Sequence, residues 1–207
     1  SMDENIGRVL DALKKKGLDK NTIVCLLSDN GGLSTAEGSP TCNFPLRAGK
    51  GWLYEGGIRE PFLIKYPKVV EAGSVCHNPV IGVDFYPTIL ELTGLPLKPE
   101  QHVDGVSLVP FLKGDRTFDR GPIFWHYPHY GGKGDTPGEA IRMGDYKLIE
   151  FYEDNHVELY NLRTDISETH DLSKEKPEVA ADLLKRLHDW RKACGAKMPK
   201  TNPNYKK

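Results

Sequence analysis

The chain has 207 residues, and 28 Lys and Arg residues against 29 Asp and Glu residues give it a formal net charge of −1. This length supports one or two domains, and the charge balance lacks the basic surplus of a dedicated DNA- or RNA-binding protein, so we expect no nucleic-acid partner. No apolar stretch approaches the roughly 20 residues that a transmembrane helix needs, so we expect no membrane span.

The first part of the chain carries the pattern of an α/β fold. Apolar residues spaced three and four apart predict an amphipathic helix over residues 3–16. Residues 22–27 are apolar on both faces, which favours a strand of a parallel sheet buried between helical layers. A second short strand is predicted over residues 62–66, and a helix over residues 84–93. We expect residues 1–120 to form part of a mixed, mostly parallel sheet flanked by helices.

The pattern changes near residue 121, where short strand signals replace the α/β alternation. Strands are predicted near residues 122–127, 140–150 and 157–161. An amphipathic helix is predicted from Pro177 to Ala193, because proline suits the first turn and apolar residues recur at helical spacing. We therefore expect residues 121–207 to form a small C-terminal α+β domain of antiparallel strands packed on one helix.

The end of the apolar segment 22–27 is a candidate metal site. Asp29 and Asn30 follow the predicted strand directly, at the place where open α/β sheets bind ligands. Their carboxylate and amide oxygens suit Ca²⁺ or Mg²⁺, although a simple turn explains the same sequence. Calcium takes about six to eight oxygen ligands, so this pair supplies only part of a site.

Residues 33–60 form a glycine-rich loop that is too long for a simple connector. Within it, Lys50 stands between two glycines, where its ammonium group can approach an oxyanion; a solvated surface lysine is the alternative. The segment lacks the GxxxxGK[ST] spacing of a phosphate-binding loop, so we exclude nucleotide binding of that type. Cys42 precedes a proline and an arginine with one residue too many for a Cys-x-Pro-x-Arg motif, and we interpret it as a plain thiol.

His126 lies in an aromatic run over residues 124–130 and is a candidate for lining a substrate pocket, with a purely structural histidine as the alternative. No HExxH motif or Cys/His cluster indicates a zinc site.

Several segments in order along the chain match the motifs of one family. They are residues 3–10, 23–32, 45–51, 54–61, 84–88, 104–108, 142–148, 158–162 and 198–203. In this combination the chain resembles the C-terminal half of an arylsulfatase of the formylglycine-dependent sulfatase family, which belongs to the alkaline-phosphatase-like superfamily. The resemblance covers nearly the whole chain.

The resemblance implies a hydrolase that cleaves sulfate esters of small molecules or glycans. It implies that Asp29 and Asn30 are two ligands of an active-site Ca²⁺ and that Lys50 contacts the sulfate group. Family members attack sulfur with a hydrated formylglycine made from the Cys or Ser of a Cys/Ser-x-Pro-x-Arg motif. A periplasmic, secreted or lysosomal location is also typical of the family, while the sequence itself identifies no compartment.

The sequence departs from the family in lacking a Cys/Ser-x-Pro-x-Arg motif. We therefore expect the formylglycine in an N-terminal half outside these 207 residues, a chain that is inactive alone, and weak or no calcium binding by it. An apolar sheet edge left open would favour self-association. The alternatives are a phosphatase or phosphodiesterase of the same superfamily and a non-catalytic scaffold that binds anions.

Overall fold

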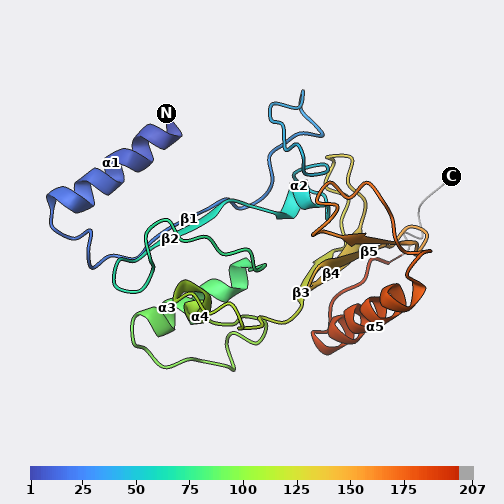
Figure 1. Cartoon of the computed structure of the whole chain (residues 1–207). Helices are drawn as coiled ribbons and strands as arrows, with labels where there is room; N and C mark the ends of the chain where they lie inside the picture. Colours follow the sequence, from blue (N-terminus) through green and yellow to red (C-terminus); the bar gives the residue numbers. More distant parts are fainter. Residues whose placement is uncertain (201–207) are drawn as a thin grey trace. The chain divides into compact units, whose positions relative to one another are not determined.

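The structure, a computed structural model, describes residues 1–200, so the expected motif at 198–203 lies partly outside the described residues (Figure 1). Its contacts divide the chain into two compact units. The first contains Ser1–Leu27 and Pro61–Arg120, and the second contains Ser28–Glu60 and the chain from Gly121 onward. The second unit is thus built from two separate stretches of sequence. The expected family domains, 1–120 and 121–207, stay a prediction, since these units are defined by contacts alone.

The first unit contains mainly short helices and one pair of strands. The helix expected near the start is confirmed, although none of its residues is buried. The helix expected over residues 84–93 is also confirmed, after a short 3-10 turn. The elements are α1 (Met2–Lys15), β1 (Val24–Leu27), β2 (Phe62–Lys65), η1 (Gly82–Asp84), α3 (Phe85–Leu92) and α4 (Val109–Leu112).

The strand pair β1–β2 corrects one expectation. The two strands run antiparallel, so the prediction that residues 22–27 form a parallel, fully buried strand is wrong for the pair that β1 forms with β2. Leu26 lies opposite Leu63, and these side chains are 40% and 58% exposed. An apolar run without alternation suggests burial on both faces, whereas β1 is half-buried at its start and exposed at its end.

The second unit contains a four-stranded antiparallel sheet in the order β3-β4-β5-β6. The single strand expected over residues 140–150 is instead a hairpin, in which Gly144 takes a positive φ of 58° in a two-residue turn. The last helix begins and ends as predicted. The elements are β3 (Ile123–Tyr127), β4 (Gly138–Met143), β5 (Tyr146–Phe151), β6 (Val157–Asn161) and α5 (Pro177–Ala193).

This sheet is covered on both faces, because successive side chains of a strand point to opposite sides. On one face, Ile141 and Leu148 pack with Leu187 of α5. On the other, Ala140 and Ile149 pack with Leu53 and neighbouring residues of the loop that precedes the short helix α2 (Glu55–Ile58). The segment that carries the candidate site residues therefore packs against one face of the sheet. No helix within residues 1–200 is long and apolar enough to cross a membrane.

Candidate functional site

Two backbone hydrogen bonds join the loop of Asp29 and Asn30 to the segment that contains Lys50 and α2. The amide of Gly31 donates to the carbonyl of Gly57 at 3.1 Å, and the amide of Lys50 donates to the carbonyl of Gly32 at 3.2 Å. All of these residues belong to the second unit. The backbone that carries the two expected metal ligands thus lies against the backbone that carries the expected sulfate contact.

The close approach of these loops requires glycine. A Cβ atom on Gly31 would lie 1.8 Å from the carbonyl oxygen of Gly56, which no side chain tolerates. A Cβ atom on Gly56 would lie 2.4 Å from the carbonyl oxygens of Arg47 and Ala48. The glycines of both motifs therefore serve to bring three stretches of backbone into contact.

Asn43 forms hydrogen bonds with both loops. Its role was not predicted from the sequence. Its side-chain amide donates to the carbonyl oxygens of Gly32 at 2.8 Å and Ala48 at 2.9 Å. The sequence offered only one signal, a polar residue with two donors inside a loop rich in glycine carbonyls.

A buried ion cluster anchors α2 to the sheet. The Nζ of Lys147 on β5 lies 3.1 Å from Glu55 Oε1 and 2.8 Å from Glu168 Oε1, and Lys147 is completely buried. Glu168 Oε2 also accepts a hydrogen bond from the Glu55 amide at 2.7 Å. Burial acts to raise the pKa of Glu55, but the charges of Lys147 and Arg59 outweigh it, so this pKa lies below its ordinary value. For Glu168 burial prevails and raises the pKa.

Arg47 fastens the beginning of the same segment. Its guanidinium donates hydrogen bonds at 2.9 Å to the Tyr160 hydroxyl and to the Glu168 carbonyl. It also lies 3.8 Å from the centre of the Tyr54 ring, in a cation–π contact. Arg47, Tyr54 and Glu55 of the recognised motifs thus hold the Lys50 loop in place.

The oxygens around Asp29 fit a cation. The Asn30 amide group donates to the Gly31 carbonyl at 3.0 Å, and its oxygen accepts no hydrogen bond from the described residues. Glu60 Oε1 is buried without a hydrogen-bond partner among the described residues. Burial, followed by the negative charge of Asp29, raises the pKa of Glu60. Uncompensated carboxylate and amide oxygens are the chemistry that Ca²⁺ selects.

His126 lies elsewhere in the second unit. Its Nδ1 is 2.7 Å from the Tyr152 hydroxyl, and its Nε2 is 3.0 Å from the Lys197 carbonyl oxygen. No hydrogen bond or ion pair within residues 1–200 joins His126 to Asp29, Asn30 or Lys50. Its role in substrate binding stays a prediction.

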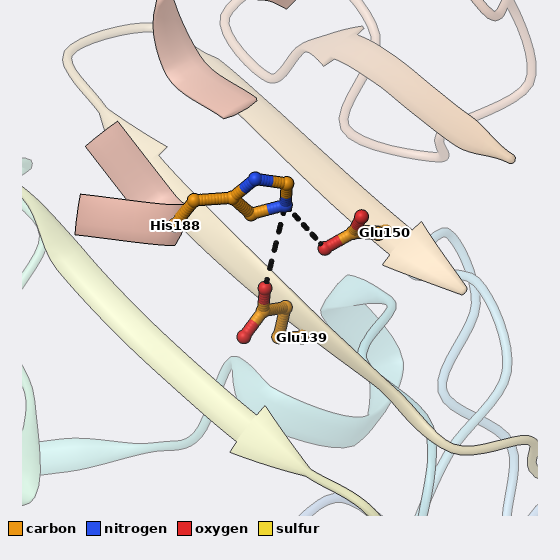
Figure 2. Close-up of side chains that lie close together, drawn as sticks. All are labelled: Glu139, Glu150 and His188. Carbon is orange, nitrogen blue, oxygen red and sulfur yellow. Dashed lines mark hydrogen bonds and ion pairs between the residues drawn. The ribbon is translucent and has the colours of Figure 1, made fainter. Parts of the chain in front are cut away.

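A second group of potential metal ligands lies between the sheet and α5. Figure 2 shows Glu139 of β4 and Glu150 of β5 facing the ring of His188, which is 2.8 Å from Glu150 Oε2. The Arg191 guanidinium lies 2.6 Å from Glu139 Oε1 and 3.2 Å from Glu150 Oε2. Because Arg191 already forms ion pairs with both carboxyl groups, we interpret this cluster as a clasp, a set of ion pairs that holds α5 against the sheet. Burial and a hydrogen bond with Glu150 raise the pKa of Glu139 to about 7.

Comparison with known proteins identifies relatives over most of the chain. The family model of N-sulphoglucosamine sulphohydrolase, C-terminal, matches residues 48–193. A sulfatase of Formosa agariphila is 39% identical over 212 residues, which cover 91% of this chain and 38% of that protein. An N-acetylglucosamine-6-O-sulfatase of Bacteroides thetaiotaomicron is 32% identical over 199 residues, which cover 93% of this chain and 34% of that protein. The chain thus spans less than two fifths of the length of either relative.

Solved structures give the same picture. Ps i-CgsB in complex with k-i-k-neocarrahexaose is similar with a TM-score of 0.79 and 36% identity, over 91% of this chain and 40% of that one. A structure in complex with its substrate D-glucosamine-2-N,6-O-disulfate is similar with a TM-score of 0.75 and 30% identity, over 92% of this chain and 38% of that one. The expected α/β fold class is thereby confirmed. The chain belongs to the sulfatase family and corresponds to its C-terminal part.

Proposed function

We propose that the chain is the part of a sulfate-ester hydrolase that helps to hold a divalent cation and contacts the sulfate group. In this proposal Asp29 and Asn30 are two ligands of Ca²⁺, and Lys50 binds the sulfate. The complete reaction converts a sulfate ester and water into an alcohol and inorganic sulfate. The observation that carries the proposal is the backbone hydrogen bond from Lys50 to Gly32, supported by the one from Gly31 to Gly57 of α2.

Each residue has a separate task. Bound Ca²⁺ supplies positive charge that stabilises the oxygens of the transferred group. The Lys50 ammonium adds a compact positive charge and hydrogen-bond donors for a sulfate oxygen. The carboxyl group of Glu60 adds negative charge beside Asp29, which favours a cation over an empty site.

The relatives support a sulfate ester as the substrate. Two of them are a sulfatase and an N-acetylglucosamine-6-O-sulfatase, and a similar structure holds a disulfated glucosamine. We therefore propose a sulfated glycan or a small sulfated sugar as the partner, rather than the phosphate ester of a related phosphatase. These 207 residues contain no Cys/Ser-x-Pro-x-Arg motif, so we propose that they bind sulfate without turning over an ester when present alone.

A calcium and sulfate titration of the 207-residue chain tests the proposal. With backbone amide NMR, Ca²⁺ should shift the signals of Asp29, Asn30 and Glu60, with a dissociation constant on the order of 1 mM, as in other weak sites. Sulfate should shift the signals around Lys50. Asp29→Ala should remove the calcium shifts, and Lys50→Gln should remove the sulfate shifts.

Asp11→Asn is the matched control for the loss of negative charge, because Asp11 lies on the exposed surface of α1. This variant should bind both ions as the unmodified chain does. Calcium shifts that persist in Asp29→Ala, or sulfate shifts that persist in Lys50→Gln, would contradict the assignment of these residues.

A further inference from the structure

A second lysine, Lys133, is held next to the Lys50 loop. The indole Nε1 of Trp52, two residues after Lys50, donates to the carbonyl oxygen of Lys133 at 3.3 Å. Gly51 packs against Asp135, since a Cβ atom on this glycine would lie 3.2 Å from Asp135 Oδ1. The turn that contains Lys133 therefore rests on the residues that directly follow Lys50.

The turn around Lys133 is organised by a buried carboxylate. Asp135 is only 5% exposed and accepts hydrogen bonds from the amides of Gly131 at 2.6 Å and Lys133 at 2.8 Å. A carboxylate that accepts two backbone donors fixes the path of the chain between them. The backbone of Lys133 is thus positioned by the fold, while its side chain stays partly exposed.

Glu37 is the acidic partner of the Lys133 side chain. Its carboxylate forms an ion pair with the Lys133 ammonium, and the Glu37 side chain is 63% exposed. The hydrogen bond from Lys133 and the charge of Lys133 lower the pKa of Glu37, and the charge of Lys50 lowers it further. The Lys133 ammonium is therefore held by an exposed carboxylate that an anion of a ligand can replace.

We propose that Lys133 binds a second anionic group of a sulfated saccharide, a second sulfate or a carboxylate, while Lys50 contacts the sulfate ester. This inference rests on the proposed function of Lys50. Glu37 occupies the position of that second group when no saccharide is bound. An exposed ion pair of this kind is weakly held, so an anion of the ligand can replace the Glu37 carboxylate at small cost.

Two sugars that differ in one substituent test the inference on the 207-residue chain. N-acetyl-D-glucosamine 6-sulfate carries one anionic group, and D-glucosamine-2-N,6-O-disulfate carries a second sulfate in place of the acetyl group. By amide NMR titration at low salt, where screening is weak, the disulfate should bind about fivefold more tightly, the value of one exposed ion pair. Lys133→Gln should abolish this preference and leave the affinity for the monosulfate unchanged.

Glu37→Gln separates ligand binding from a purely structural ion pair. It removes the competing carboxylate, so it should tighten binding of the disulfate, whereas loss of a structural link would weaken it. Lys133→Arg should keep the preference. Lys185→Gln, which removes an exposed lysine of α5 paired with Asp189, is the control and should change nothing.

The outcomes distinguish this inference from the proposed function. If both sugars bind in a Lys50-dependent way but Lys133→Gln keeps the preference for the disulfate, the role of Lys133 is wrong and that of Lys50 stands. If neither sugar shifts the signals around Lys50, both proposals fail. Unchanged thermal unfolding of Lys133→Gln and Glu37→Gln ensures that altered binding reflects the side chains themselves.

Discussion

Lys147 should be the most sensitive charged residue of the second unit. It is completely buried between Glu55 and Glu168, so its removal takes away the cation that these carboxyl groups share and leaves Glu55 only its pairs with Arg59 and Arg142. We expect Lys147→Met to lower the free energy of unfolding by about 3–5 kcal/mol, the cost of breaking a buried ion pair. Urea unfolding followed by circular dichroism measures this loss.

Lys185→Met is the matched control, because Lys185 forms an exposed ion pair with Asp189 on the surface of α5. Exposed pairs contribute about 0–1 kcal/mol. An equal loss of stability in both variants would show that the buried cluster does not anchor the Lys50 segment.

The motif residues could be predicted from the sequence, but the buried residues that hold their segment in place could not. Asp29 and Asn30 stood out because oxygen-bearing side chains directly follow a predicted strand, and Lys50 stood out because glycines flank it on both sides. Lys147 and its partners did not, because charged residues in a sequence look like a solvated surface. The Lys147 pairs span 92 and 21 positions along the chain, so nothing local in the sequence reveals them.

Among the secondary-structure elements, α5 was the most predictable and the β4–β5 hairpin the least. A proline at the first turn and a clear 3.6-residue period define α5 without reference to the rest of the chain. The hairpin turns within two residues, Gly144 and Asp145, so both strands read as one continuous segment. The pairing of β1 depends on a partner more than 30 residues away and is decided by tertiary contacts.

The clasp between α5 and the sheet should make stability depend on pH. Glu139 has a pKa of about 7 in the folded chain, against an ordinary value of 4.5. Between these values the folded chain keeps a proton that the unfolded chain has lost, so stability falls as pH rises through this window. The slope is at most about 1.4 kcal/mol per pH unit for one proton.

Glu139→Gln should flatten this part of the profile, because glutamine does not titrate. Glu139 also faces His126, His188, Arg191 and Glu150. The difference between the pH profiles of Glu139→Gln and the unmodified chain therefore isolates the contribution of Glu139. Thermal unfolding at pH 5–8 measures both, with the exposed Glu100→Gln as control. Parallel profiles for Glu139→Gln and the unmodified chain would contradict the raised pKa.

The exposed strand pair β1–β2 offers apolar surface through which one chain can associate with another in solution. Among the described residues, β1 and β2 pair only with each other, and Leu26 and Leu63 lie exposed on one face. Two-stranded sheets with open edges and apolar faces favour association. We therefore expect the 207-residue chain to self-associate with rising concentration.

Leu26→Thr combined with Leu63→Thr should reduce this association, because threonine retains β propensity but removes apolar surface. Sedimentation velocity over a range of concentrations measures the effect. Val103→Thr, at a residue that is 80% exposed and outside the strands, should leave the association unchanged. A chain that sediments as a monomer throughout would refute the expectation.

The second unit draws on two stretches of sequence, and this limits how such proteins can be recombined. A piece cut at Gly121 would keep the sheet and α5 but would lose Leu53, which covers one face of the sheet, and Glu55, one of the two carboxylates paired with Lys147. Transfer of the C-terminal piece alone into another sulfatase would therefore need a host whose own loop supplies a matching acid and apolar cover. The sheet and the glycine-rich loop would have to be transferred together, although 60 residues of the other unit separate them in the chain.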